Sequence, residues 1–158
     1  MIVGEAPGRA EVAKGEPFVG KSGKLLDTVL RSVGVSRDDV YITNVVKELP
    51  LDSEGKIRRP YPAEIDAWKE ILEGEILSTA PTAILALGRT AFEALTGAKG
   101  DFAWSGSQIG NVYGAWHPAY LLRQGFTGPL SHWTASDTAL DSMEDWVFQI
   151  RQWAKAAW

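Results

Sequence analysis

Apolar residues recur along the chain at two different spacings, which predict strands and helices in turn. Short apolar and β-branched runs predict four strands, over residues 1–4, 40–46, 83–88 and 111–116. Apolar positions three and four apart predict four helices, over about 25–33, 62–80, 89–96 and from about 136 onward. Strands that alternate with helices favour a parallel sheet covered by helices on both faces.

The predicted sheet also indicates where to search for a site. In such sheets, ligands bind in the crevice at the carboxyl ends of the strands. Trp146, Ile150 and Trp153 follow helical spacing in the last helix and are predicted to anchor the core. No repeat or low-complexity segment divides the chain, so we expect a single domain over 1–158. The long stretches predicted to be irregular are 5–20, 48–61, 98–110 and 124–135.

Composition narrows the class of protein. The 158 residues are 45% hydrophobic, which excludes intrinsic disorder, and no apolar run approaches the ~18 residues that span a bilayer. The absence of cysteine excludes disulfides, thiolate zinc sites, cysteine nucleophiles and cysteine-bound clusters. With only His117 and His132, we expect no multi-histidine metal site. The residues after Met1 do not form a secretory signal peptide, which would have a basic stretch followed by an apolar one, so we expect a cytoplasmic protein.

The formal net charge of −4 counts against a protein that coats DNA nonspecifically, because such proteins are usually basic. An acidic net charge still allows a basic patch on part of the surface. Lys14, Lys21 and Lys24 lie close together in the sequence, and Arg58 and Arg59 form a second pair. Scattered lysines on a solvated surface are the plainer interpretation of the same residues.

A phosphate-loop pattern, G-x-x-x-x-G-K-S, covers residues 15–22. In P-loop proteins a strand runs directly into the first glycine and backbone amides cradle the phosphates. Here the predicted strand ends about ten residues earlier, and Pro17 and Phe18 would remove an amide donor and crowd the loop. We therefore interpret the match as a coincidence of spacing, and a nucleotide-binding P-loop remains the third candidate.

Four segments at predicted strand ends carry the candidate chemistry. Glu5 brings a carboxylate after the first strand, and Phe18 brings an aromatic ring beside a glycine-rich helix start. Asn44 is a lone amide in an apolar strand, and His117 precedes a turn that begins with proline. Each has a structural alternative as a core or hydrogen-bonded residue. Together they suit a pocket for a flat heterocycle, with stacking, an amide for a base edge and a histidine for a developing oxyanion.

The motifs that contain these residues resemble those of the uracil-DNA glycosylase superfamily. Residues 4–8 and 15–26 resemble its first motif, most of all in the bacterial and archaeal family 4 branch. Residues 41–47 and 117–123 resemble later motifs of that branch, so the likeness covers nearly the whole chain in order. It implies a three-layer α/β/α sandwich with a four-stranded parallel sheet. It also implies a monofunctional DNA repair glycosylase that hydrolyses the N-glycosidic bond of uracil and leaves an abasic site.

One departure from the family 4 pattern is large. The resemblance to family 4 implies a structural [4Fe-4S] cluster held by four cysteines, whereas this chain has no cysteine. By this resemblance Glu48 and Trp68 stand at two of the cysteine positions, and we expect the helix that carries the other two to be absent. We expect no cofactor and no metal, with the loop over 48–61 held by packing. The expected origin is a phage, or a divergent bacterium or archaeon.

The resemblance also suggests a role for each candidate residue. His117 would stabilise the leaving uracil and Glu5 would assist, while Phe18 stacks on the base and Asn44 reads its edge. Ala6 contributes to the substrate pocket and stands where the best-known branch carries a water-orienting aspartate. The residues expected to contact DNA are Lys21, Ser22, Leu121, Leu122 and Arg123, with Leu121 or Leu122 as the wedge.

The expected partner is uracil-containing DNA, bound by a monomer without a membrane. The alternative is a uracil- or DNA-binding module of the same fold, catalytically weak or inactive. The missing aspartate and the acidic net charge favour that module, whereas the set of Glu5, Phe18, Asn44 and His117 favours an enzyme.

Overall fold

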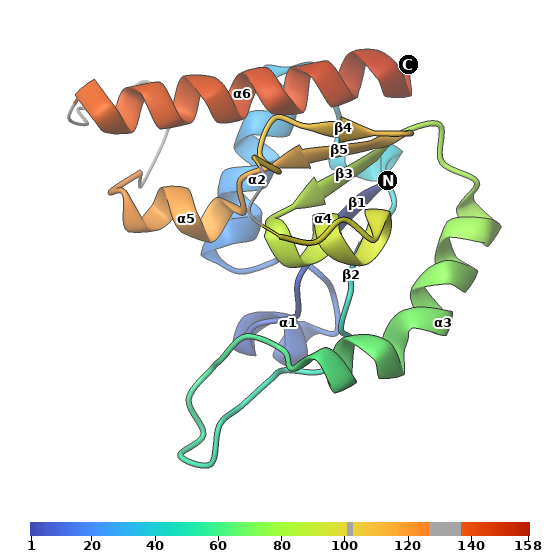
Figure 1. Cartoon of the computed structure of the whole chain (residues 1–158). Helices are drawn as coiled ribbons and strands as arrows, with labels where there is room; N and C mark the ends of the chain where they lie inside the picture. The colour runs from blue at the N-terminus through green and yellow to red at the C-terminus, as the bar shows by residue number, and fades with distance from the viewer. Residues whose placement is uncertain (101–102, 127–136) are drawn as a thin grey trace.

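A five-stranded sheet forms the centre of the protein in a computed structural model that describes residues 1–100, 103–126 and 137–158. The strands lie in the order β2-β1-β3-β5-β4 (Figure 1). They are β1 (Ile2–Gly4), β2 (Ile42–Asn44), β3 (Ile84–Leu87), β4 (Gln108–Ile109) and β5 (Val112–Ala115). The first three and β5 run parallel, which confirms the four predicted strands and their direction.

Strand β4 was not expected, so the prediction of four strands is wrong by one. It pairs antiparallel with β5 through a tight turn in which Gly110 adopts a φ of 58°. Its two residues are both exposed, so no apolar alternation marks them in the sequence.

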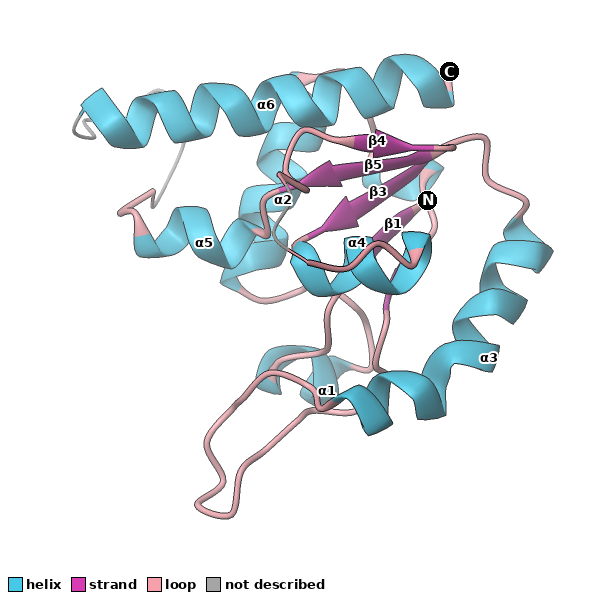
Figure 2. Cartoon of the chain, in the orientation of Figure 1, coloured by secondary structure: helices cyan, strands magenta, loops and turns pink. Residues whose placement is uncertain are grey.

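The helices are α1 (Arg9–Lys14), α2 (Lys21–Ser32), the 3-10 helix η1 (Arg37–Asp39), α3 (Pro62–Thr79), α4 (Arg89–Thr96), α5 (Pro118–Arg123) and α6 (Asp137–Ala157). The four predicted helices are present as α2, α3, α4 and α6, and α1, η1 and α5 are additional to them (Figure 2). Helix α1 falls in a stretch predicted to be irregular, because its six residues include none that is buried. Most of the stretch 124–135, including His132, lies outside the described residues.

Side chains of the sheet alternate between two apolar layers. Ile2, Leu85 and Leu87 face the layer that holds α2, α5 and α6, whereas the neighbouring strand residues face α3 and α4. This burial on both faces explains the continuous apolar run at 83–88. Trp146, Ile150 and Trp153 are fully buried in the first layer, which confirms them as core anchors.

Helix α3 packs on the second apolar layer through Leu72 and the partly buried Ile65, Trp68 and Ile76, and a polar contact adds to this packing. Leu72 is its only fully buried residue, and Glu75 links it to β2. The Glu75 carboxylate accepts hydrogen bonds from the Thr43 hydroxyl at 3.0 Å and from Lys47 Nζ at 2.6 Å. No helix among the described residues is both long enough and apolar enough to cross a membrane.

Candidate active site

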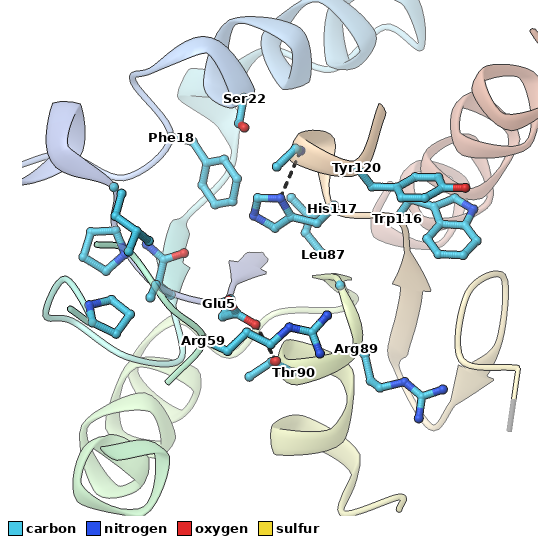
Figure 3. A pocket seen from close by; sticks show the side chains of 18 of the residues that line it. Glu5, Phe18, Ser22, Arg59, Leu87, Arg89, Thr90, Trp116, His117 and Tyr120 are labelled. Atoms are coloured by element: carbon cyan, nitrogen blue, oxygen red, sulfur yellow. Dashed lines mark hydrogen bonds between the residues drawn. The ribbon is translucent and has the colours of Figure 1, made fainter. Parts of the chain in front are cut away.

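A pocket of about 720 Å³ opens where the parallel strands end, as the sheet topology predicts (Figure 3). Its volume lies within the range typical of small-molecule sites. Seven of the residues singled out from the sequence line it: Glu5, Ala6, Phe18, Ser22, Asn44, His117 and Arg123. They come from four separate segments of the chain, which the fold brings together.

The other three predicted residues do not line the pocket. Lys21 is exposed at the first position of α2, and Leu122 is half-buried against the first core layer. Leu121 has no exposed surface and packs in that same layer. Of the two leucines expected to wedge into DNA, Leu122 is the more accessible, so it is the stronger candidate for that role.

Phe18 forms one wall of the pocket and is held from behind. Its backbone adopts a φ of 51°, a left-handed conformation that costs energy in a non-glycine residue. Arg37 stabilises it, because its guanidinium donates to the carbonyl oxygen of Phe18 at 2.8 Å and to that of Pro17. The same guanidinium pairs with Asp27 at 2.9 Å. The ring centroids of Phe18 and His117 lie 5.7 Å apart across the site.

Asn44 presents a hydrogen-bond acceptor that nothing satisfies. The side chain is 6% exposed at the end of β2, and its Oδ1 accepts no hydrogen bond from the described residues. Leaving a buried acceptor without a partner costs about 1–3 kcal/mol. Lys47 Nζ donates to the Asn44 carbonyl oxygen at 2.5 Å and so holds this strand end in place. The arrangement suits a ligand that brings its own N–H to Oδ1.

His117 is held in one tautomer by its own helix. It caps the N-terminus of α5, and its Nδ1 accepts a hydrogen bond from the Ala119 backbone N–H at 3.1 Å. In a neutral ring, the proton therefore sits on Nε2. Burial of the ring and, to a smaller degree, the nearby Arg123 lower the pKa of His117 to about 4. Near neutral pH the ring offers a neutral Nε2–H donor.

Glu5 is oriented by a residue that the sequence did not reveal. The Thr90 hydroxyl, at the start of α4, donates to Glu5 Oε2 at 2.5 Å, as Figure 3 shows. Thr90 comes shortly after the end of β3. Glu5 and His117 were chosen as candidates because they follow strand ends in the same way. Applying that rule to β3 would have found it, although a threonine at a helix start is common for other reasons.

The pocket also contains residues that the sequence did not single out for the site. They include two aromatic rings stacked with centroids 4.5 Å apart, Trp116 and Tyr120. Arg58 and Arg59 also line the pocket, although the sequence alone favoured a surface role for this pair. Arg58 and Arg59 reach the pocket because of the path that the loop between β2 and α3 takes, and no local sequence pattern predicts that path.

The residues present do not fit an iron–sulfur cluster. Such clusters need thiolate ligands, and the chain has no cysteine. At the two positions named above, Glu48 is exposed and the Trp68 indole packs partly buried against the second core layer. The expectation that packing holds the loop over 48–61 stays a prediction. No cluster of three or more potential metal ligands occurs in the described part of the chain.

The segment with P-loop spacing is built differently from a phosphate loop. Gly15 follows helix α1 and not a strand. The backbone N–H groups of Val19 and Gly20, at the start of α2, both donate to Glu11 Oε1, at 3.2 and 3.0 Å. The protein's own carboxylate thus occupies the position at which a P-loop binds phosphate, which argues against nucleotide binding.

Comparisons with known proteins point to one family. A family model described as the uracil DNA glycosylase superfamily matches residues 1–138. The type-4 uracil-DNA glycosylase of Archaeoglobus fulgidus is 47% identical over 91 residues, 58% of this chain and 44% of that protein. The enzyme of the same name from Thermotoga maritima is 39% identical over 132 residues, which are 78% of this chain and 66% of the relative. The type-4 uracil-DNA glycosylase of Pyrobaculum aerophilum is 38% identical over 140 residues, which are 78% of this chain and 68% of that protein. The chain thus spans between 44% and 68% of the length of these relatives.

Proposed function

The chain belongs to the uracil DNA glycosylase superfamily, and from this premise we propose that it excises uracil from DNA by hydrolysing the N-glycosidic bond. Uracil within a duplex is out of reach, so the nucleotide must rotate out of the stack into the pocket. The product is an abasic site in an intact strand. The pocket described above supplies a group for each demand of this reaction.

The observation that carries the proposal is the unpartnered Asn44 Oδ1. Uracil presents an N3–H donor beside its O4 acceptor, so one asparagine amide pairs with both. Cytosine presents an acceptor at N3 and a donor at C4, which opposes the Asn44 amide in the orientation that suits uracil. A buried site that is built to receive an N–H rejects ligands without one, because its own polar group stays unpaired. Phe18 covers one face of the base.

His117 provides the main stabilisation of the leaving group in this proposal. Breaking the C1′–N1 bond leaves an anionic uracil whose charge spreads to O2. The neutral Nε2–H of His117 is free to donate to that oxygen, since Nδ1 is engaged by Ala119. A fixed neutral donor requires no proton transfer at the moment of cleavage.

Glu5 has the secondary role. Its carboxylate, oriented by Thr90, stabilises the cationic sugar or holds the attacking water. Ala6, which lines the pocket, has no group that orients water, so this task falls to Glu5 or to backbone atoms. Ser22 and Arg123 at the pocket, and Lys21 beside it, bind flanking phosphates, and Leu122 fills the space that the uracil vacates.

A binding module without turnover is the second candidate, and the specific observation that favours it is the methyl group of Ala6 in the pocket wall. Both candidates predict recognition of uracil through Asn44. They differ in the product, because only the enzyme leaves an abasic site.

The test is incubation of the purified protein with labelled oligonucleotides that differ only in one base, uracil, cytosine or thymine, followed by alkali. The proposal predicts strand scission at uracil alone. A gel shift with uracil-containing DNA and no scission would instead support the binding module. Scission at cytosine as fast as at uracil would contradict the role given to Asn44.

A further inference from the structure

The loop between β2 and α3 forms a separate wall of the pocket. It projects from the body of the protein (Figure 1) and is closed on itself by an antiparallel bridge between Leu51 and Ile57. Arg9 of α1 ties its tip down by donating to the Gly55 carbonyl oxygen at 2.6 Å. Ile57, Arg58 and Arg59 of this loop line the pocket. A tied loop of this kind can hold side chains in fixed positions.

The two adjacent arginines of the loop are used differently, and Arg58 is fully engaged. Its guanidinium makes two hydrogen bonds to the Glu64 carboxylate, at 2.7 and 2.9 Å, and lies 3.7 Å over the Tyr61 ring. It also donates to the backbone carbonyl oxygen of Arg59 at 2.9 Å. Arg58 therefore fixes the backbone from which the Arg59 side chain extends.

The guanidinium of Arg59 has no such partner. Within the described residues it makes no hydrogen bond and no ion pair, and it extends into the pocket in Figure 3. Glu5 and Glu64 both make other contacts, since Glu5 accepts from Thr90 and Glu64 pairs with Arg58.

The charge around the pocket is opposite to that of the whole protein. Four arginines line it, Arg58, Arg59, Arg89 and Arg123, against two carboxylates, Glu5 and Glu11. The chain as a whole carries a formal net charge of −4. Arg58 pairs with Glu64 and Arg89 with Glu93, and the basic residues that remain at this site suit the approach of a polyanion.

We propose that Arg59 binds a backbone phosphate of the DNA strand that carries the uracil, next to the flipped nucleotide. This assignment rests on the proposed function, and it adds a DNA contact from the loop between β2 and α3. Arginine matches a phosphate with two parallel N–H donors, so the contact fixes the strand's position without reading its sequence. Arg58 acts as a positioning residue that keeps the neighbouring guanidinium aimed at the strand.

The experiment compares the wild type with Arg59→Gln and with Arg151→Gln, which removes the same charge from an exposed position on α6. Affinity is measured with single-stranded DNA that carries 2′-fluoro-deoxyuridine, because the fluorine resists formation of the cationic sugar and blocks cleavage. The slope of log affinity against log salt, from about 50 to about 200 mM, should fall by about 0.7 in Arg59→Gln. Arg151→Gln should keep the wild-type slope.

A second measurement locates the contact. Neutral methylphosphonates replace the phosphates of the oligonucleotide one at a time. One position next to the uracil should weaken binding by the wild type, whereas Arg59→Gln should be insensitive at that same position. Thermal unfolding should be unchanged in Arg59→Gln, because the side chain is exposed.

The outcomes separate the two proposals. If the wild type neither cleaves nor binds uracil-containing DNA, the proposed function fails. If the wild type excises uracil and Arg59→Gln retains the full salt slope, the function stands and the Arg59 contact is overturned. A fall in the rate of excision without any change in salt slope also overturns it, since Arg59 would then act on the reacting nucleotide.

Discussion

Gly4 separates the two residues that we propose to contact the base, and replacing it with alanine tests their placement. A Cβ at this position would lie 2.5 Å from Asn44 Oδ1 and 2.5 Å from Phe18 Cζ. Ordinary contacts begin at 3.4 Å, so each group must move by about 0.9 Å. Asn44 is buried at a strand end held by Lys47, and Phe18 is clamped by Arg37, so the displaced groups move toward the pocket.

The size of the effect follows from that displacement. Overpacking of this kind costs about 1–3 kcal/mol, which lowers the melting temperature of a chain of this size by about 2–12 °C. A shift of about 1 Å in groups that position a substrate lowers a rate by about 10²-fold. We therefore expect Gly4→Ala to fold at 25 °C and to lose about 10²-fold in kcat/KM for uracil excision.

Gly74→Ala is the matched control. Gly74 lies in the middle of α3, with nothing within 4 Å of an added Cβ. Alanine there should raise stability by about 0.5–1 kcal/mol and leave excision unchanged. The assays are thermal unfolding and single-turnover excision from a labelled oligonucleotide. Wild-type kcat/KM in Gly4→Ala would refute the placement of Asn44 and Phe18 on either side of Gly4.

Three further predictions concern His117 and the glycine-rich segment. His117→Ala should lower the excision rate by about 10²–10³-fold and by more than Glu5→Ala does, measured under single turnover; equal rates for wild type and His117→Ala would contradict the leaving-group role. Because the pKa of His117 is lowered to about 4, its contribution to stability is complete above pH 6.5 and is lost as the pH falls from 6.5 toward 4. Denaturant titrations should therefore show the wild type losing on the order of 2 kcal/mol relative to His117→Ala between pH 7.5 and 4.5, and a constant difference would count against the low pKa. ATP should leave the melting temperature unchanged, since Glu11 occupies the amides of the loop; an ATP-dependent rise that disappears in Lys21→Ala would restore the P-loop interpretation.

The sequence predicted the fold wherever burial imposes a pattern. Strand β3 is buried on both faces and helix α6 has an apolar stripe, so both were recognisable from hydrophobic spacing alone. Helix α1 and strand β4 were missed because neither contains a buried residue. Local spacing has no signal for an element that lies at the surface.

The candidate site was predictable to the extent that it follows the ends of strands. Glu5, Asn44 and His117 stand directly at or after such ends, and the topology brings them to one pocket. The pairing of the supporting contacts was not predictable, because Arg37 reaches Phe18 across 19 positions and Thr90, itself near a strand end, reaches Glu5 across 85. Leu121 and Leu122 show the same limit. Adjacent leucines are equivalent in the sequence, and only the packing of α5 decides that Leu121 is buried.

The central claim is that Asn44 recognises uracil in a site that breaks its glycosidic bond. The most direct test is the single-turnover rate of excision from a uracil-containing oligonucleotide by the wild type and by Asn44→Ala. We expect excision by the wild type and a rate about 10²-fold lower in Asn44→Ala. No excision by the wild type, or equal rates for the two proteins, would contradict it.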